Sequence, residues 1–157
     1  MQKELFVETL ENPELDSLLL NVDLDPRIRF LSLSHPTNSK IVYYVNFRGG
    51  LLILGLNERK ILTSLELNIH KDHWIMTDWR LPKVFSPTIK LLQFPNIEVR
   101  ANENELPVEV YTNETNSFVS IAIDNSEEVN SSWIPISKQC YVGVKDNYLQ
   151  GFWIILN

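Results

Sequence analysis

A chain of 157 residues with 44% hydrophobic and 22% charged residues is typical of one globular domain, which excludes a mostly disordered protein. No apolar run approaches the ~20 residues that a membrane-spanning helix needs, and the acidic start of the sequence lacks the features of a secretory signal, so we expect a cytoplasmic protein without a membrane partner. The net charge of −6 and the pI of about 5.0 argue against binding to nucleic acid.

The charge is divided along the chain into three blocks. Residues 1–25 carry a net charge of −6, residues 26–94 carry +6 and residues 95–157 carry −6. Blocks of this kind either compensate one another inside the fold or provide separate faces for charged partners. Both interpretations are open from the sequence.

Residues 1–25 form an acidic N-terminal segment in which a short helix is predicted. Asn12 suits the N-cap position and Pro13 the first helical position. Three leucines follow at helical spacing, namely Leu15, Leu18 and Leu19. A further turn or two of helix is open to residues 5–10, separated from the first helix because a residue that precedes proline avoids the helical region.

Residues 26–70 make up a first β half, because the hydrophobic period changes there to two. Leu65 and Leu67, for example, alternate with Glu66. This alternation is typical of an antiparallel sheet with one buried face and one face in water. We expect four strands, near residues 29–34, 41–47, 51–56 and 61–69.

Residues 71–107 form a connector between the two β halves. Four prolines interrupt it, so a long regular element is not expected there. Its apolar side chains, including Trp74 and Trp79, are too numerous for a free linker. We expect the connector to wrap over a surface of the sheets.

Residues 108–157 make up a second β half, with strands predicted near residues 108–111, 118–124, 140–144 and 148–156. The tripeptide Thr-Asn-Ser precedes a strand in both halves, at residues 37–39 and 115–117. Two similar four-stranded meanders, each with one apolar face and unpaired edges, would be stable only when packed together. Duplication and a chance likeness between two hairpin-rich segments explain the pattern equally well.

The elements together predict a mainly β fold in a single domain that covers residues 1–157. About eight antiparallel strands from two similar four-stranded halves would form a sandwich or a partly closed barrel, with a short helix near the N-terminus.

The strongest candidates for chemistry are His70, Asp72 and His73, whose side chains suit a transition metal. The adjacent strand ends near Ile69, so solvated turn residues are the better interpretation, and we expect neither a metal nor a cofactor. The single cysteine, Cys140, lies in an apolar run and is interpreted as a buried hydrophobe. An Arg-Gly-Gly turn at residues 48–50 offers backbone N–H groups to an anion, but a hairpin needs glycine there anyway.

No catalytic motif stands out, so the sequence favours a non-enzymatic protein-binding module of an immunity-like or inhibitor-like kind. Its partner would be a protein, with a basic surface as one option, and complementary charge would speed the encounter. The predicted contact residues are the acids of the N-terminal segment and two tryptophans in loop-like segments: Glu4, Glu8, Glu11, Glu14, Trp79 and Trp133. The competing interpretation is that these tryptophans cover the ends of the β core.

Two alternatives remain from the sequence. One is a small-molecule-binding β-barrel or an enzyme, with its site near the His70–His73 loop and with walls that include Tyr43 and Tyr44. The other is a homodimer in which the edges of two sheets pair.

Overall fold

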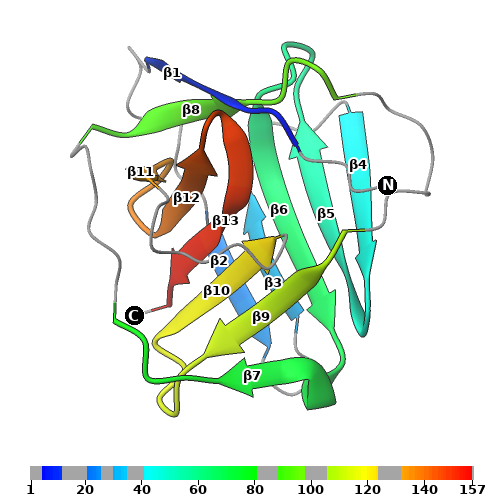
Figure 1. Cartoon of the computed structure of the whole chain (residues 1–157), viewed down its shortest axis with the longest axis vertical. Coiled ribbons are helices and arrows are strands. Elements are labelled where there is room, and N and C mark those ends of the chain that lie inside the picture. The colour runs from blue at the N-terminus through cyan, green and yellow to red at the C-terminus, as the bar shows by residue number, and fades with distance from the viewer. Residues whose placement is uncertain are drawn as a thin grey trace.

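A computed structural model describes residues 5–11, 21–25, 30–34, 41–80, 88–97, 106–123 and 132–156. Within these ranges the chain forms thirteen strands in three sheets and one 3-10 turn (Figure 1). The prediction of a mainly β fold is therefore confirmed. The sheets do not close into a barrel, and the two large ones form a sandwich.

The first large sheet has five strands, all paired in antiparallel fashion, in the order β2-β3-β6-β5-β4. The strands are β2 (Asn21–Asp25), β3 (Phe30–Ser34), β4 (Ile41–Phe47), β5 (Gly50–Leu56) and β6 (Leu62–Ile69). Phe47 pairs with Gly50, so only Arg48 and Gly49 form the turn between β4 and β5. Gly49 has a φ of +92°, a conformation that glycine adopts without a steric penalty.

The second large sheet has six strands in the order β11-β12-β13-β10-β9-β7. They are β7 (Trp74–Met76), β9 (Val108–Thr112), β10 (Phe118–Ile123), β11 (Ser132–Pro135), β12 (Cys140–Lys145) and β13 (Tyr148–Ile155). The pairing is antiparallel except between β7 and β9, which run parallel. A 3-10 turn, η2 (Lys71–His73), leads from β6 of the first sheet into β7 of the second.

A two-stranded sheet of β1 (Glu8–Glu11) and β8 (Lys90–Gln93) crosses the upper end of the sandwich in Figure 1. Leu5 and Val7, just before β1, are buried in the main core. Leu92 of β8 is buried there too. The small sheet therefore covers one end of the space between the large sheets.

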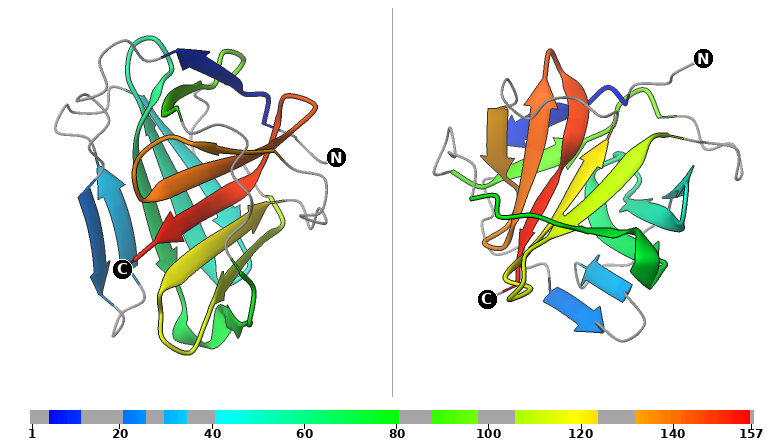
Figure 2. Two further views of the ribbon diagram at one scale, coloured as in Figure 1. Left: turned by 90° about the vertical axis from the view of Figure 1, so that its left-hand side faces the viewer. Right: turned by 60° about the horizontal axis from the view of Figure 1, so that its bottom comes forward.

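The main core lies between the two large sheets, which face each other in Figure 2. Alternate residues of several strands contribute to it, such as Leu52 and Leu54 of β5 and Val119 and Ile121 of β10. Burial of apolar area is the main favourable contribution to folding, at about 25 cal/mol per Å². The alternation predicted from the sequence is thus the pattern that holds the sandwich together.

The predicted helix is the main correction. Residues 8–11 form β1, so the further helical turn that the sequence left open at residues 5–10 is wrong. Residues 21–25, at the end of the same acidic segment, form β2. Residues 12–20, where the helical signals were strongest, lie outside the described residues. Leu5 and Val7 have the two-residue period of an extended chain, and pairing of β1 with β8 satisfies the backbone of the segment.

The strand order gives no support to an internal duplication. The hairpins β5–β6 and β12–β13 correspond as expected. However, β3 pairs with the last strand of its half, β6, whereas its counterpart β9 pairs with the next strand along the chain, β10. The first Thr-Asn-Ser copy, at residues 37–39, lies outside the described residues. The two halves thus share strands of similar pattern but not one topology.

No helix among the described residues has the length and apolar character needed to cross a membrane.

Candidate functional site

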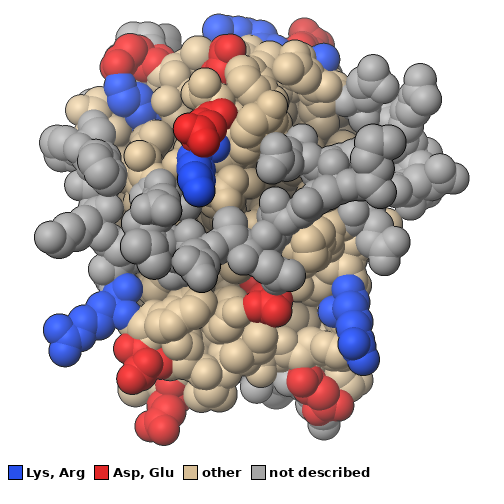
Figure 3. Space-filling view, in the orientation of Figure 1, with Lys and Arg blue, Asp and Glu red and all other residues tan. Residues whose placement is uncertain are grey.

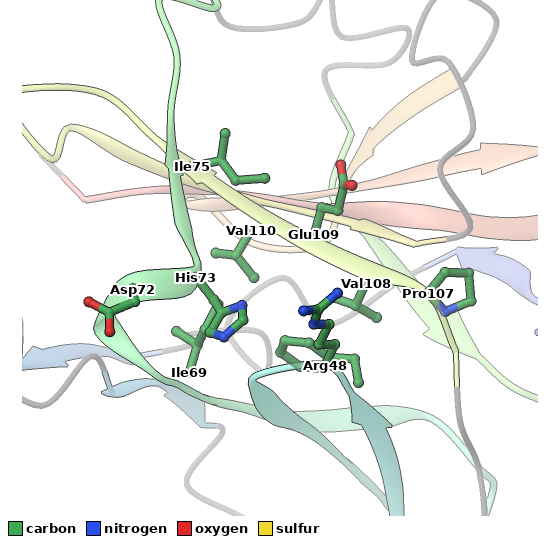
Figure 4. A pocket seen from close by; sticks show the side chains of 10 residues that line it. Arg48, Ile69, Asp72, His73, Ile75, Pro107, Val108, Glu109 and Val110 are labelled. Atoms are coloured by element: carbon green, nitrogen blue, oxygen red, sulfur yellow. The ribbon is translucent and has the colours of Figure 1, made fainter.

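One hollow in the described structure, termed here the Arg48 pocket, lies beside the β4–β5 turn (Figure 4). It has a volume of about 360 Å³. The β4–β5 turn, the η2 turn and the strands β7 and β9 surround it. Its lining residues are Phe47, Arg48, Ile69, Asp72, His73, Ile75, Pro107, Val108, Glu109 and Val110.

The Arg48 pocket has an apolar floor and a polar rim. The floor consists of four buried side chains that also belong to the main core, Phe47, Ile69, Val108 and Val110. Arg48, Asp72, His73 and Glu109 are exposed around it. An apolar floor with a few convergent polar groups is the usual composition of a ligand site.

Backbone contacts fix the position of His73. The amide of His70 donates to the carbonyl of Gly49 at 2.8 Å, and the amide of His73 donates to the carbonyl of His70 at 2.9 Å. The η2 turn is therefore tied to the β4–β5 turn. The His73 ring lies against Gly49, where a Cβ would come within 2.4 Å of its Cγ. Glycine at this position thus provides both the positive φ and the space for the imidazole.

One of the two carboxylates of the rim, Glu109, has a hydrogen-bond partner outside the pocket, and the other, Asp72, lies near an imidazole nitrogen that accepts from the Asp72 amide. Asp72 Oδ2 lies 3.4 Å from His70 Nδ1. Glu109 accepts a hydrogen bond from the Tyr111 hydroxyl. Figure 4 shows both carboxyl groups pointing away from the space between Arg48 and His73. Arg48 has no ion pair with any residue in the described ranges.

Among the strands that the structure describes, β7 forms the edge of the six-stranded sheet, and it carries exposed apolar side chains. Ile75 is 38% exposed and Met76 is 58% exposed. Ile75 lines the Arg48 pocket, and Met76 lines a second, more open hollow of about 580 Å³. That hollow is shared by β7 and the β9–β10 turn, and its other lining residues are Thr77, Asp78, Asn113, Glu114 and Thr115.

Asp72 and His73 lie on the η2 turn, and His70 is its N-cap residue. Asp72 and His73 line the Arg48 pocket, but His70 does not, and its side chain is 61% exposed. In the described part of the chain, no group of three or more His, Cys, Asp or Glu side chains is placed to hold a metal ion.

Tyr43 and Tyr44 do not line the Arg48 pocket. Tyr43 is part of the main core, and burial raises the pKa of its phenol. Tyr44, the next residue of β4, points to the other face of the sheet because side chains alternate along a strand. The proposed tyrosine walls are therefore not part of this site.

The N-terminal acids are only partly described. Glu8 and Glu11 are exposed on β1, where Glu11 makes an ion pair with Lys90 of β8. Glu4 and Glu14 lie outside the described residues. Glu8 thus stays available to a partner, while part of the charge of Glu11 is neutralised within the molecule.

Trp79 and Trp133 belong to an aromatic cluster on the outer face of the six-stranded sheet. Trp133 is 5% exposed and packs edge-on against Trp153, with ring centroids 6.1 Å apart. Trp79 is half-buried, with its ring centroid 4.2 Å from that of Tyr111. Gly143 gives Trp133 room, since a Cβ there would lie 3.0 Å from its ring. Trp133 therefore covers the sheet and offers little area to a partner.

Cys140 is buried between the sheets, and burial raises the pKa of its thiol. A thiol that stays protonated is a poor nucleophile. The interpretation of Cys140 as a buried hydrophobe is confirmed.

Sequence reasoning missed Glu109 and the edge strand β7. The signal for β7 was the run Trp74-Ile75-Met76, three large apolar residues in a row inside the polar sequence around them. The prolines of residues 71–107 predict an irregular connector, and this short strand lies within it. Comparisons with family models and with curated proteins found no match for this chain.

Proposed function

We propose that this chain is a non-enzymatic protein-binding module that takes an extended segment of its partner along β7. The observation that carries the proposal is the exposure of Ile75 and Met76 on a strand at the edge of a sheet. An open edge is a template for another strand, and exposed apolar side chains along it favour pairing.

The geometry of β7 suits strand addition. The amide of Thr77 donates to the carbonyl of Thr112 in β9 at 2.8 Å. Because backbone groups alternate in direction along a strand, the amide of Met76 turns toward the open edge. In recognition of this kind, main-chain hydrogen bonds supply affinity and pockets for alternate side chains supply specificity. Ile75 and Met76 each line a different hollow, which meets the second requirement.

The charges around β7 favour a partner with basic side chains. Four acids line the two hollows, Asp72, Asp78, Glu109 and Glu114, against the single arginine Arg48. Acidic and basic groups are interspersed along the lower edge of the face in Figure 3, so the complementarity is local. An inhibitor-like role, in which the module masks a basic surface, would use this region.

The proposal is tested by photo-crosslinking in the cells that produce the chain. Met76 is replaced by the photoreactive residue benzoylphenylalanine in the full chain, and the matched control carries it at Val42, which is 36% exposed on β4. We expect one protein to be captured at position 76 and not at position 42, and the purified protein to bind the unmodified chain.

Three results define the outcome of the crosslinking. Capture of the same proteins at both positions, or none at position 76, would contradict docking at β7. Crosslinks to a second copy of this chain would replace the proposed partner by a homodimer, with the same edge as its interface.

A second candidate function is the binding of a small molecule in the Arg48 pocket. It is favoured by the apolar floor and by a volume of about 360 Å³, which lies within the usual range of about 300–1,000 Å³ for ligand sites.

A further inference from the structure

We infer that the Arg48 pocket binds a carboxylate attached to a small apolar group. The inference rests on the second candidate function and names the chemical class of its ligand. It needs no docking along β7, since the pocket is formed without a partner.

The first argument is the direction of the charged groups around the pocket. Arg48 and His73 face each other across the mouth in Figure 4. Asp72 and Glu109 line the same pocket, but their carboxyl groups point away from the space between Arg48 and His73, and Glu109 accepts a hydrogen bond from the Tyr111 hydroxyl. The polar groups left to meet a ligand are therefore a guanidinium and an imidazole.

The second argument is the chemistry of these two groups. A guanidinium is always charged in proteins and presents a planar fork of N–H donors that matches the two oxygens of a carboxylate. Imidazole donates one further N–H in its neutral form. Together, Arg48 and His73 can supply donors to both oxygens of one carboxylate.

The third argument is that the imidazole is held in place before any ligand arrives. The hydrogen bond from the His70 amide to the Gly49 carbonyl ties the η2 turn to the β4–β5 turn, and the His73 amide bonds to His70. Because Gly49 has no Cβ, the His73 ring has space beside the β4–β5 turn. A donor that is already in position loses less entropy on binding than a mobile one.

The fourth argument concerns the rest of the ligand. The Arg48 pocket is also lined by the buried side chains Ile69, Val108 and Val110. They offer no hydrogen bonds, so the body of the ligand is apolar. A pocket of about 360 Å³ accommodates one aromatic ring or a short aliphatic chain.

The test uses phenylacetate and its neutral isostere phenylacetamide as probes. The amide resonances of the full chain are followed by NMR during titration with each probe. We expect phenylacetate to shift resonances of the β4–β5 turn, η2 and the start of β9, and to bind at least about tenfold more tightly than phenylacetamide.

Variants then assign the effect to the two side chains. Arg48→Gln and His73→Phe are each expected to weaken phenylacetate binding at least about fivefold and to leave phenylacetamide binding nearly unchanged. The matched control is Arg59→Gln, which removes an exposed arginine from the β5–β6 turn and should leave both affinities unchanged.

The outcomes separate the inference from the candidate function. Equal binding of both probes in the Arg48 pocket would overturn the carboxylate inference and leave the small-molecule function standing. If neither probe shifts resonances at the pocket at concentrations up to about 10 mM, which is roughly the weakest affinity of interest, both the carboxylate inference and the small-molecule function are overturned. An equal loss in the Arg59 variant would show nonspecific charge attraction and would also overturn the inference.

Discussion

Replacement of Phe152 by alanine is expected to lower the free energy of unfolding by about 3–5 kcal/mol. Phe152 lies on β13 and is fully buried in the core between the two large sheets. The change removes apolar contacts and leaves a cavity that close-packed neighbours can fill only in part. Urea denaturation followed by tryptophan fluorescence measures the loss.

Phe6→Ala is the matched control, because it makes the same chemical change at a half-exposed position. Phe6 packs edge-on against Tyr148, with ring centroids 5.9 Å apart. An exposed aromatic pair of this kind contributes about 0.5–1.5 kcal/mol. Equal losses for the two variants would show that Phe152 is not part of a core shared by the sheets.

Met76→Asp is expected to weaken binding of the partner captured at β7 at least about thirtyfold, the effect of losing a contact of about 2 kcal/mol at the centre of an interface. The side chain of Met76 is 58% exposed in the free chain, so docking would bury a large apolar area. The added carboxylate would also need to be desolvated. Isothermal titration calorimetry with the purified partner measures the change in Kd.

The matched control for this variant is Val42→Asp, which places the same charge on an exposed strand position in the other sheet. It should change the Kd less than about twofold, and both variants should keep the unfolding free energy within about 1 kcal/mol of the original. A similar loss of affinity in both variants would point to the net charge of the protein rather than to a contact at β7.

Strands of the sandwich such as β6 could be predicted because they have one wet and one dry face. In β6, the alternation of Leu65 and Leu67 with Glu66 is visible without any knowledge of the neighbouring strands. The short strands β1 and β8 could not be predicted, because no local alternation of apolar and polar residues marks them. Each is stabilised by its pairing with the other and by apolar residues that reach the core, such as Val7 and Leu92.

The order of strands within the sheets could not be predicted. Hairpins such as β4–β5 are local and are indicated by a glycine turn. The pairings of β3 with β6 and of β10 with β13 join segments far apart in the sequence, and no local signal specifies them. Two halves with similar strands therefore arrive at different topologies.

The candidate site was predicted in part. His73 and Asp72 were identified because imidazole and carboxylate groups cluster there in the sequence. The sequence marks Arg48 only as part of a glycine turn, and no motif marks Glu109 as a site residue. Folding brings these side chains around one hollow, and it also turns both carboxylates away from the space between Arg48 and His73. That second effect depends on contacts that sequence spacing does not reveal.

Hydrogen–deuterium exchange tests most directly whether a partner adds a strand to β7. The amide of Met76 is measured in the free chain and in the complex with the captured partner. The account predicts that exchange slows at least about tenfold on binding, because the amide gains a main-chain acceptor from the new strand. Unchanged exchange at Met76, with protection confined to other strands, would contradict it.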